Sequence, residues 1–225
     1  GRPVAGGSMH VVLIEPAFPV NQREFVRGLA AVGARVTAIG ERPVESFDPD
    51  LKSWLYRYHQ VRSVVDERAV GYLVEQIMRS EPVDRLEATI EAHIMSTARI
   101  RQALGIPGTS ERTAFLCRDK PAMKEALRAA GVPCAQSIGA TSADEVWDFA
   151  RRVGYPLILK PPAAAGASGT IKVDNDQELA AALPGSGVLQ GQALAVEEFI
   201  EGHEGFYDTI TINGEVVHDF ACHYY

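Results

Sequence analysis

The sequence predicts an α/β protein in two parts: a parallel, doubly wound sheet domain followed by an α+β unit. Over residues 10–104, apolar runs of strand length alternate with amphipathic helical patterns, which is typical of a parallel sheet covered by helices. The segment GIPGTSER at 105–112 then marks a boundary. Further on, Asn213-Gly214 joins two alternating runs, which is the strongest short signal for a β-hairpin.

The elements of the first part follow from the periodicity of its apolar residues. HVVLI at 10–14 is a continuous apolar run of the length of a buried strand, and Gly33 is a plausible stop for the helix that follows it. We expect strands at 10–14, 35–40, 58–65 and 84–91. We expect helices at 21–32, 68–79 and 95–104.

The second part reads as an α+β unit that ends in a hairpin. Residues 113–130 have the pattern of two short helices closed by Gly131. The other expected helices are 143–153 and 177–183. The expected strands are 137–140, 156–160, 170–173, 193–200, 206–212 and 215–225.

Composition limits the class of protein. The 225 residues suit one large domain or two small ones, and 46% hydrophobic with 23% charged residues is ordinary for a globular chain. The net charge of −7 does not recruit nucleic acid, although local lysines can still hold an anionic ligand. No apolar run reaches membrane-spanning length.

The cysteines and the first eight residues lead to two further expectations. Three cysteines, far apart and in no CxxC pattern, favour a reducing compartment, so we expect a cytoplasmic protein without a disulfide framework or a zinc cluster. The residues GRPVAGGS at 1–8 precede Met9 without any pattern and are interpreted as a cloning remnant.

A lysine followed by a loop of small residues is the first feature that suggests chemistry. Lys160 ends the apolar run PLILK, and the loop AAAGASG follows at 163–169. Backbone N–H groups of such a loop can approach a ligand closely, so a lysine and this loop form a plausible phosphate clamp. A surface hairpin with a slack loop and a solvent-reaching lysine is an equally good interpretation. The Walker pattern GxxxxGK[ST] and the dinucleotide fingerprint GxGxxG are absent.

Three other stretches carry candidate residues. In AVEEFIEGHE at 195–204, Glu197 and Phe199 would share one face of a strand, although an acidic surface turn explains the stretch as well. Lys120 begins a helix with Asp119 as its expected N-cap, and an ordinary exposed lysine is the alternative. Glu91 and His93 are expected at the end of the fourth strand, in a substrate or a capping role.

Taken together and in this order, these stretches resemble the ATP-grasp superfamily. The resemblance rests on Asp119-Lys120, on 155–161 with the loop 163–169, and on 197–202 with Glu204, while 87–108 is similar to the family's lead-in segment. It implies phosphate contacts from Lys120 and Lys160, a flap at 163–169, adenine contacts around Glu197 to Ile200, and a ribose contact from Glu204. The implied nucleotide-binding residues are Lys120, Lys160, Ala165, Gly166, Ala167, Ser168, Gly169, Glu197, Glu198, Phe199, Ile200 and Glu204.

The resemblance also implies a domain plan. Residues 9–110 would form the Rossmann-like domain that precedes the ATP-grasp domain, and 111–225 would form the first part of the ATP-grasp domain itself. Within the latter, the small lobe would span about 133–200, and 201–225 would begin the large lobe. The sequence stops before the acidic residues and the asparagine that hold magnesium in the family, so we expect a fragment of a longer protein.

The implied function is that of an ATP-dependent carboxylate–amine ligase that forms an acylphosphate from a carboxylate and lets an amine attack it. ATP and Mg²⁺ are the implied cofactors, small carboxylates and amines the implied partners, and a homodimer is possible. A biotin-carboxylase-like component and a non-catalytic nucleotide-binding fragment are the alternatives. Neither the substrates, nor catalytic residues, nor metal ligands can be assigned from the sequence.

Overall fold

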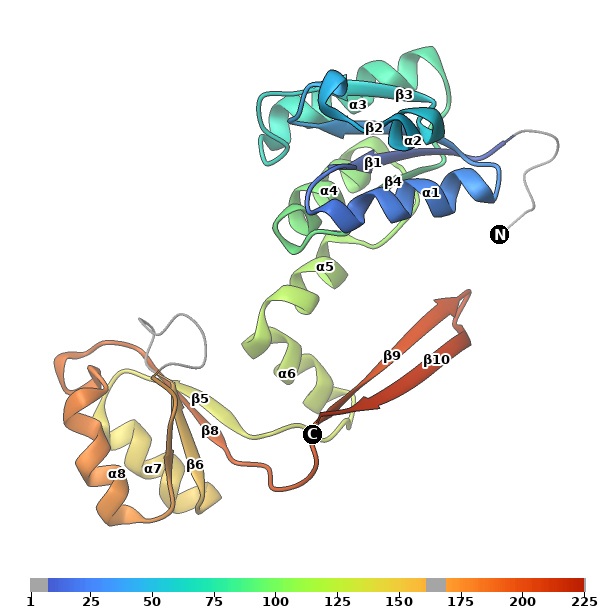
Figure 1. Cartoon of the computed structure of the whole chain (residues 1–225). Coiled ribbons are helices and arrows are strands. Elements are labelled where there is room, and N and C mark those ends of the chain that lie inside the picture. The colour runs from blue at the N-terminus through green and yellow to red at the C-terminus, as the bar shows by residue number, and fades with distance from the viewer. Residues whose placement is uncertain (1–7, 161–168, 225) are drawn as a thin grey trace. The chain divides into compact units, whose positions relative to one another are not determined.

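The computed structural model describes residues 8–160 and 169–224, and the chain divides into two compact units. Unit 1 runs to Met123 and unit 2 begins at Lys124 (Figure 1). No helix within these two described ranges is both long and apolar enough to cross a lipid bilayer.

Unit 1 is built on a four-stranded sheet of order β3-β2-β1-β4 in which all neighbours are parallel. Its strands are β1 (His10–Ile14), β2 (Arg35–Gly40), β3 (Arg57–Gln60) and β4 (Arg85–Glu87). The chain moves outward from β1 to β3 and then returns to place β4 on the other side of β1. The strand order therefore reverses between β1 and β4, which confirms the doubly wound sheet.

Helices cover both faces of this sheet (Figure 1). Val12 and Ile14 pack into one core cluster with Val74 of α3, while Leu13 packs into another with Val26 of α1. This alternation explains why every residue of β1 is buried. The helices of unit 1 are α1 (Arg23–Ala31), α2 (Pro49–Trp54), α3 (Glu67–Ser80), α4 (Glu91–Leu104), α5 (Glu111–Arg118) and the start of α6 (Lys120–Ala129), with 3₁₀ turns η1 (Val20–Gln22) and η2 (Val44–Ser46).

Some predicted boundaries in unit 1 are wrong. The strand expected at 84–91 is only β4, and the helix expected at 95–104 begins at Glu91. The alternating sequence EATIEA resembles a strand, but Glu91 lies in the first helical turn, where an acidic side chain is favourable. His93 consequently lies on a helix, together with Glu91, rather than on a strand. The third strand is also shorter than expected and ends at Gln60.

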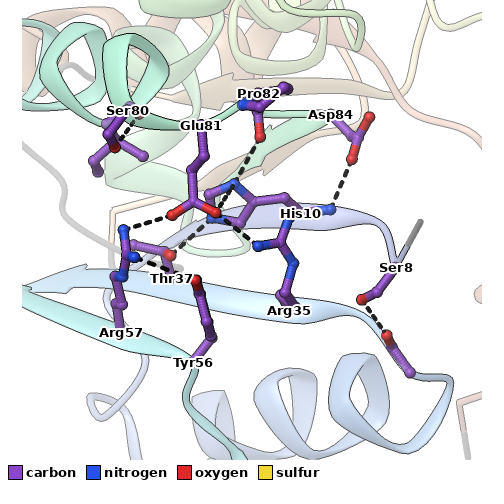
Figure 2. A network of polar contacts seen from close by, with 12 residues as sticks. Ser8, His10, Arg35, Thr37, Tyr56, Arg57, Ser80, Glu81, Pro82 and Asp84 are labelled. Carbon is purple, nitrogen blue, oxygen red and sulfur yellow. Dashed lines mark hydrogen bonds and ion pairs between the residues drawn. The ribbon is translucent and has the colours of Figure 1, made fainter.

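Glu81 joins several elements at the amino ends of the strands (Figure 2). Its carboxylate, only 12% exposed, accepts hydrogen bonds from Arg35 at 2.7 Å and from Arg57 at 2.6 Å. The buried His10 ring lies beside it, with Nδ1 2.8 Å from the Pro82 carbonyl and Nε2 2.8 Å from the Thr37 hydroxyl. This network fixes the starts of β1, β2 and β3 against the end of α3.

Unit 2 contains a four-stranded sheet of order β5-β8-β6-β7 with antiparallel neighbours. Its strands are β5 (Ser137–Ala140), β6 (Leu157–Lys160), β7 (Ile171–Val173) and β8 (Leu194–Glu198). The unit also contains helices α7 (Ala143–Val153) and α8 (Asp176–Ala182), with η3 (Leu183–Gly185) and η4 (Val188–Gln190). Phe149 of α7 and Leu179 of α8 pack with Leu157 and Leu194 in one core, so the helices cover one face of the sheet (Figure 1).

The expected hairpin is confirmed as β9 (Gly205–Ile212) and β10 (Glu215–His223). Asn213 and Gly214 connect the strands with φ angles of 52° and 86°. Positive φ at both central residues is the signature of a type I′ turn, which Asn-Gly favours.

Candidate functional site

The sheet of unit 2 has one face that the helices do not cover, and its strands place charged side chains there. In β8, Leu194 and Val196 point into the core, so Glu197 points to the opposite face. Ile158 of β6 pairs with Glu197, and Lys160 lies two residues further along the same face. The strand register therefore brings two predicted site residues, Lys160 and Glu197, together.

Glu197 is held between two lysines. Its Oε2 lies 2.8 Å from the Nζ of Lys160, and its Oε1 lies 2.9 Å from the Nζ of Lys124, which comes from α6. The side chain of Lys160 is 47% exposed, whereas those of Glu197 and Lys124 are 22% and 15% exposed. The two ammonium groups exceed the charge of the one carboxylate, so the group is cationic.

The electrostatics of Glu197 follow from these contacts. Burial raises the pKa of its carboxyl, but hydrogen bonds and positive charge from Lys160 and Lys124 outweigh burial, and the net pKa lies below the usual value. Glu197 is therefore ionised at neutral pH and holds both lysines as ammonium partners.

A third lysine extends the same face. Lys172 of β7 pairs with Ile158 across the strands, so its side chain leaves the sheet on the side of Glu197. Its Nζ lies 2.8 Å from a carboxylate oxygen of Asp174 and 4.8 Å from the ring centre of Phe199. A concentration of ammonium groups beside an aromatic ring suits an anionic ligand with a flat, apolar part.

Some polar groups of the residues after Glu197 already form hydrogen bonds within the fold. The backbone N–H of Glu198 donates to the Gln136 carbonyl at 2.9 Å, and its carboxylate accepts from the Gln136 N–H at 3.0 Å. The Phe199 N–H donates to the Pro156 carbonyl at 3.0 Å. Ile200 follows the strand with 62% of its surface exposed. The Glu198 and Phe199 amides are therefore already used, whereas Ile200 is accessible.

The remaining predicted residues lie elsewhere. Glu204 is exposed directly before β9. In the loop, Ala165, Gly166, Ala167 and Ser168 fall outside the described residues, while Gly169 is an exposed turn residue with φ of 108°.

Lys120 is the first residue of α6 and is exposed. Asp119 caps this helix, as expected, by accepting the Ala122 N–H at 2.8 Å. Lys120 belongs to unit 1 and Lys160 to unit 2, so a joint role of the two lysines stays a prediction.

Lys124 is the residue that sequence reasoning missed. It follows Lys120 by four positions in α6, and residues with that spacing share a helix face. The repeat in KPAMK was the available signal. What the sequence does not contain is the pairing of Lys124 with a carboxylate 73 positions away.

Comparison with known proteins shows what the chain is similar to. Residues 119–213 match the family model described as the ATP binding domain of the carbamoyl-phosphate synthase L chain. An L-arginine-specific L-amino acid ligase from Bacillus subtilis is 27% identical over 176 residues, which is 76% of this chain and 43% of that protein. Alanine–anticapsin ligase from Bacillus subtilis is 25% identical over 237 residues, covering 95% of this chain and 46% of that one.

Solved structures share the fold. Phosphoribosylglycinamide synthetase from Anaerococcus prevotii has a TM-score of 0.74 at 18% identity, over 96% of this chain and 51% of that one. N5-carboxyaminoimidazole synthetase from Staphylococcus aureus, complexed with ADP, has a TM-score of 0.60 at 16% identity, over 88% and 49% of the two chains. This chain thus spans about half the length of the proteins it resembles. The family model over residues 119–213 and these relatives agree with the resemblance to the ATP-grasp superfamily, and the solved structures share the fold.

Proposed function

We propose that unit 2 binds ATP and that the protein is an ATP-dependent ligase that joins a carboxylate to an amine. The observation that carries this proposal is the Lys124–Glu197–Lys160 group on the uncovered face of the sheet. Phosphoryl transfer depends mainly on positioning and on neutralising phosphate charge, and ammonium groups supply the second of these. Both relatives described above are amino acid ligases, which supports the carboxylate–amine class.

The two lysines are suited to different tasks. Lys124 is nearly buried against Glu197 and serves to hold that carboxylate in place. Lys160 is half exposed, so it can exchange its contact with Glu197 for a phosphate oxygen without moving the backbone. Lys160 is therefore the proposed phosphate-binding residue of unit 2, with Lys120 as its proposed counterpart.

The base and sugar contacts complete the proposed site. Glu197 would meet the adenine amino group, the backbone at Glu198 and Ile200 the adenine edge, and Glu204 the ribose. The Glu198 N–H already donates to the Gln136 carbonyl. We therefore propose the carbonyl of Glu198, rather than its N–H, as the group that contacts adenine. The ADP complex of the Staphylococcus aureus synthetase supports an adenine nucleotide as the ligand.

The proposed reaction has two steps. Transfer of the γ-phosphoryl group from ATP to a carboxylate oxygen gives an acylphosphate and ADP. The amine nitrogen then attacks the acyl carbon, the bond from that carbon to the phosphate oxygen breaks, and an amide, inorganic phosphate and a proton are released. In this scheme Lys160 neutralises charge on the phosphates, and Lys124 keeps Glu197 ionised and oriented.

Magnesium is implied by the family, and the described residues do not offer it a ready site. Among them there is no group of three or more His, Cys, Asp or Glu side chains arranged to hold a metal ion. We therefore assign no residue to magnesium and derive no step through it. A homodimer likewise stays a prediction.

ADP release tests the proposed reaction. The full-length protein is incubated with ATP, magnesium and pairs drawn from a panel of amino acids, and ADP is measured with a coupled assay. We expect at least one carboxylate–amine pair to raise ADP release above the rate without amino acids. If every pair gives the background rate, the ligase proposal is wrong.

Replacement of Lys160 tests the nucleotide site itself. We expect Lys160→Ala to weaken ADP binding, measured by titration calorimetry, by about tenfold or more, because a charge-assisted hydrogen bond to phosphate is lost. Lys52→Ala is the matched control, since Lys52 lies in α2 of unit 1, and it should leave ADP affinity unchanged. Equal affinities for Lys160→Ala and the parent protein would remove Lys160 from the site.

A further inference from the structure

A cavity of about 420 Å³ in unit 1 takes no part in the proposed nucleotide site. It lies beyond the carboxyl end of β4, and open α/β sheets bind their ligands beyond the carboxyl ends of their strands. Its wall combines Glu87, the last residue of β4, with residues of α4 and α5, the helices that follow β4 in the chain (Figure 1). All of its lining residues belong to unit 1.

A buried arginine lines this cavity. Arg101 of α4 is only 4% exposed, and because a guanidinium group stays charged it needs partners within the fold. Its Nη1 donates to the Leu86 carbonyl at 2.6 Å and to Oε2 of Glu87 at 2.8 Å, and its Nε donates to the Thr109 carbonyl at 3.2 Å. Gly108 packs so closely on this side chain that a β-carbon there would lie 2.7 Å from Cδ of Arg101. These contacts hold the guanidinium group in one position.

The remaining nitrogen of Arg101 is open to a ligand. Its Nη2 forms no hydrogen bond with any described residue. Nη2 is also not among the described side-chain atoms that are enclosed without a partner, so solvent reaches it. Because Arg101 lines the cavity and is otherwise buried, solvent reaches Nη2 through the cavity. Polar groups of buried side chains are nearly always hydrogen-bonded, so these donors call for an acceptor.

A second guanidinium group lines the same cavity. Arg118 is the last residue of α5, and its Nη1 donates to the backbone carbonyl of Glu91. The same nitrogen lies 3.6 Å from a carboxylate oxygen of Glu91, whose side chain is 80% exposed. An exposed pair at this distance contributes little stability. Arg118 can therefore exchange the Glu91 carboxylate for the carboxylate of a ligand, which its planar group binds well.

The two carboxylates in the cavity wall also have unused oxygens. Glu87 accepts the hydrogen bond from Arg101 with Oε2, and no described residue donates to its Oε1. Burial raises the pKa of Glu87, and the charge and hydrogen bond of Arg101 only partly offset this effect, so a further positive charge beside Glu87 is favourable. Glu91 has only the long contact with Arg118 among the described ion pairs.

This pattern of charges selects among ligands. The charged residues of the wall are two arginines and two glutamates, so a phosphate dianion would meet two carboxylates and a simple cation would meet two guanidinium groups. A zwitterion with a separate carboxylate and ammonium group suits both kinds of side chain. Ala88, Ile94 and Ala114 add apolar surface to the wall, which suits an apolar side chain.

We propose that this cavity binds an α-amino acid. Arg101 and Arg118 hold its carboxylate. Glu87 and Glu91 hold its ammonium group. The identification of this amino acid as a substrate rests on the proposed ligase function, whereas the site itself rests only on the contacts within unit 1.

Calorimetric titration of the full chain with each of the common L-amino acids, without nucleotide, tests the site. The tightest binder is then compared with two matched probes, the amine that lacks its carboxylate and the carboxylic acid that lacks its amino group. We expect each probe to bind at least about tenfold more weakly, because each leaves one pair of charged side chains without a partner. Absence of binding by every amino acid would overturn the proposal, and so would an undiminished affinity for either probe.

Substitutions locate the site. Arg118→Gln is expected to weaken amino-acid binding about tenfold, because a charge-assisted hydrogen bond is lost. Arg112→Gln is the matched control and should bind as the parent does, since Arg112 is exposed in the same helix but does not line the cavity. Lys160→Ala, in unit 2, should also leave amino-acid binding unchanged. Arg118 is exposed, so its replacement should leave the fold intact, and unchanged binding in Arg118→Gln overturns the proposal.

Alkylation of Cys117 provides an independent measurement of where the amino acid binds. Its thiol is exposed and lines the cavity. At an amino-acid concentration about ten times Kd, its reaction with iodoacetamide should slow about tenfold, because only the unliganded fraction reacts. Cys222 in β10 is the internal control whose rate should not change, and peptide mass spectrometry measures both rates. An unprotected Cys117 overturns the proposal, whereas absent ADP release with intact amino-acid binding overturns only the ligase function.

Discussion

At the residue scale, one carboxylate determines the state of the proposed nucleotide site. Glu197 holds Lys124 and Lys160 at 2.9 and 2.8 Å, on the face of the sheet that α7 and α8 leave uncovered. This arrangement keeps both ammonium groups in place when no anionic ligand is bound. A phosphate group has only to replace one carboxylate oxygen at Lys160, so binding does not require the protein to bury a new charge.

The lowered pKa of Glu197 makes a prediction about stability and pH. The folded-state pKa lies below the unfolded value, so the carboxylate stabilises the fold fully above the unfolded pKa, and this stabilisation is lost as pH falls through the folded pKa. We expect Glu197→Gln to lower the free energy of unfolding of unit 2 by about 1–2 kcal/mol at pH 7. Urea unfolding of both proteins from pH 7 to pH 3 should show this difference shrinking toward acid. A difference that is constant with pH would contradict the assigned ion pairs.

At the scale of elements, Glu81 shows how one side chain aligns several strands. Arg35 at the start of β2 and Arg57 at the start of β3 both donate to it from within 2.7 Å (Figure 2). Its carboxylate is mostly buried, so its loss leaves two guanidinium groups without their partner.

We expect Glu81→Gln to reduce the stability of unit 1 by about 2–3 kcal/mol, because breaking a largely buried ion pair is costly. Glu75→Gln, in the helix that ends just before Glu81, is the matched control, since Glu75 forms an exposed pair with Arg79 at 3.0 Å. That change should cost less than about 0.5 kcal/mol. Urea unfolding monitored in unit 1 measures the change in the free energy of unfolding for both variants. Equal effects of the two variants would show that the Glu81 network does not stabilise the strands.

Elements whose signals are local were predictable from the sequence. Helix α7 has the expected bounds because Ser142 and Glu145 form a capping box at its start and Gly154 ends it. The hairpin was predictable because Asn213-Gly214 itself fixes the turn. Helix α2 was missed, although Asp48 caps it and Pro49 begins it, because it has only six residues and too little periodicity to detect.

The candidate sites were predictable only where one motif carries them. Lys160 and Glu197 follow from the order of the family's motifs, and the strand register then brings them together. The role of Lys124 depends on a contact between segments far apart in the sequence. Sequence patterns contain no information on which distant side chains meet, so this residue required the structure.

At the scale of the whole molecule, each unit has a hydrophobic core of its own. Phe149 and Leu194 belong to the core of unit 2, whereas Leu13 and Leu86 belong to the clusters on the two faces of the unit 1 sheet. Each unit also carries one tryptophan packed against its own core, Trp147 in unit 2 and Trp54 in unit 1. The chain therefore provides one fluorescent reporter for each unit.

These cores predict that the two units unfold separately. Phe149 is 1% exposed, and its truncation to alanine should cost unit 2 about 3–5 kcal/mol because it removes the largest buried side chain of that core. In a Trp54→Phe background, Trp147 fluorescence should report a urea midpoint shifted to lower concentration. In a Trp147→Phe background, Trp54 should report an unchanged midpoint. Leu86→Ala should instead lower the midpoint that Trp54 reports and leave the midpoint that Trp147 reports unchanged. If Phe149→Ala moves both midpoints together, the two cores form one cooperative unit and the prediction of separate unfolding is wrong.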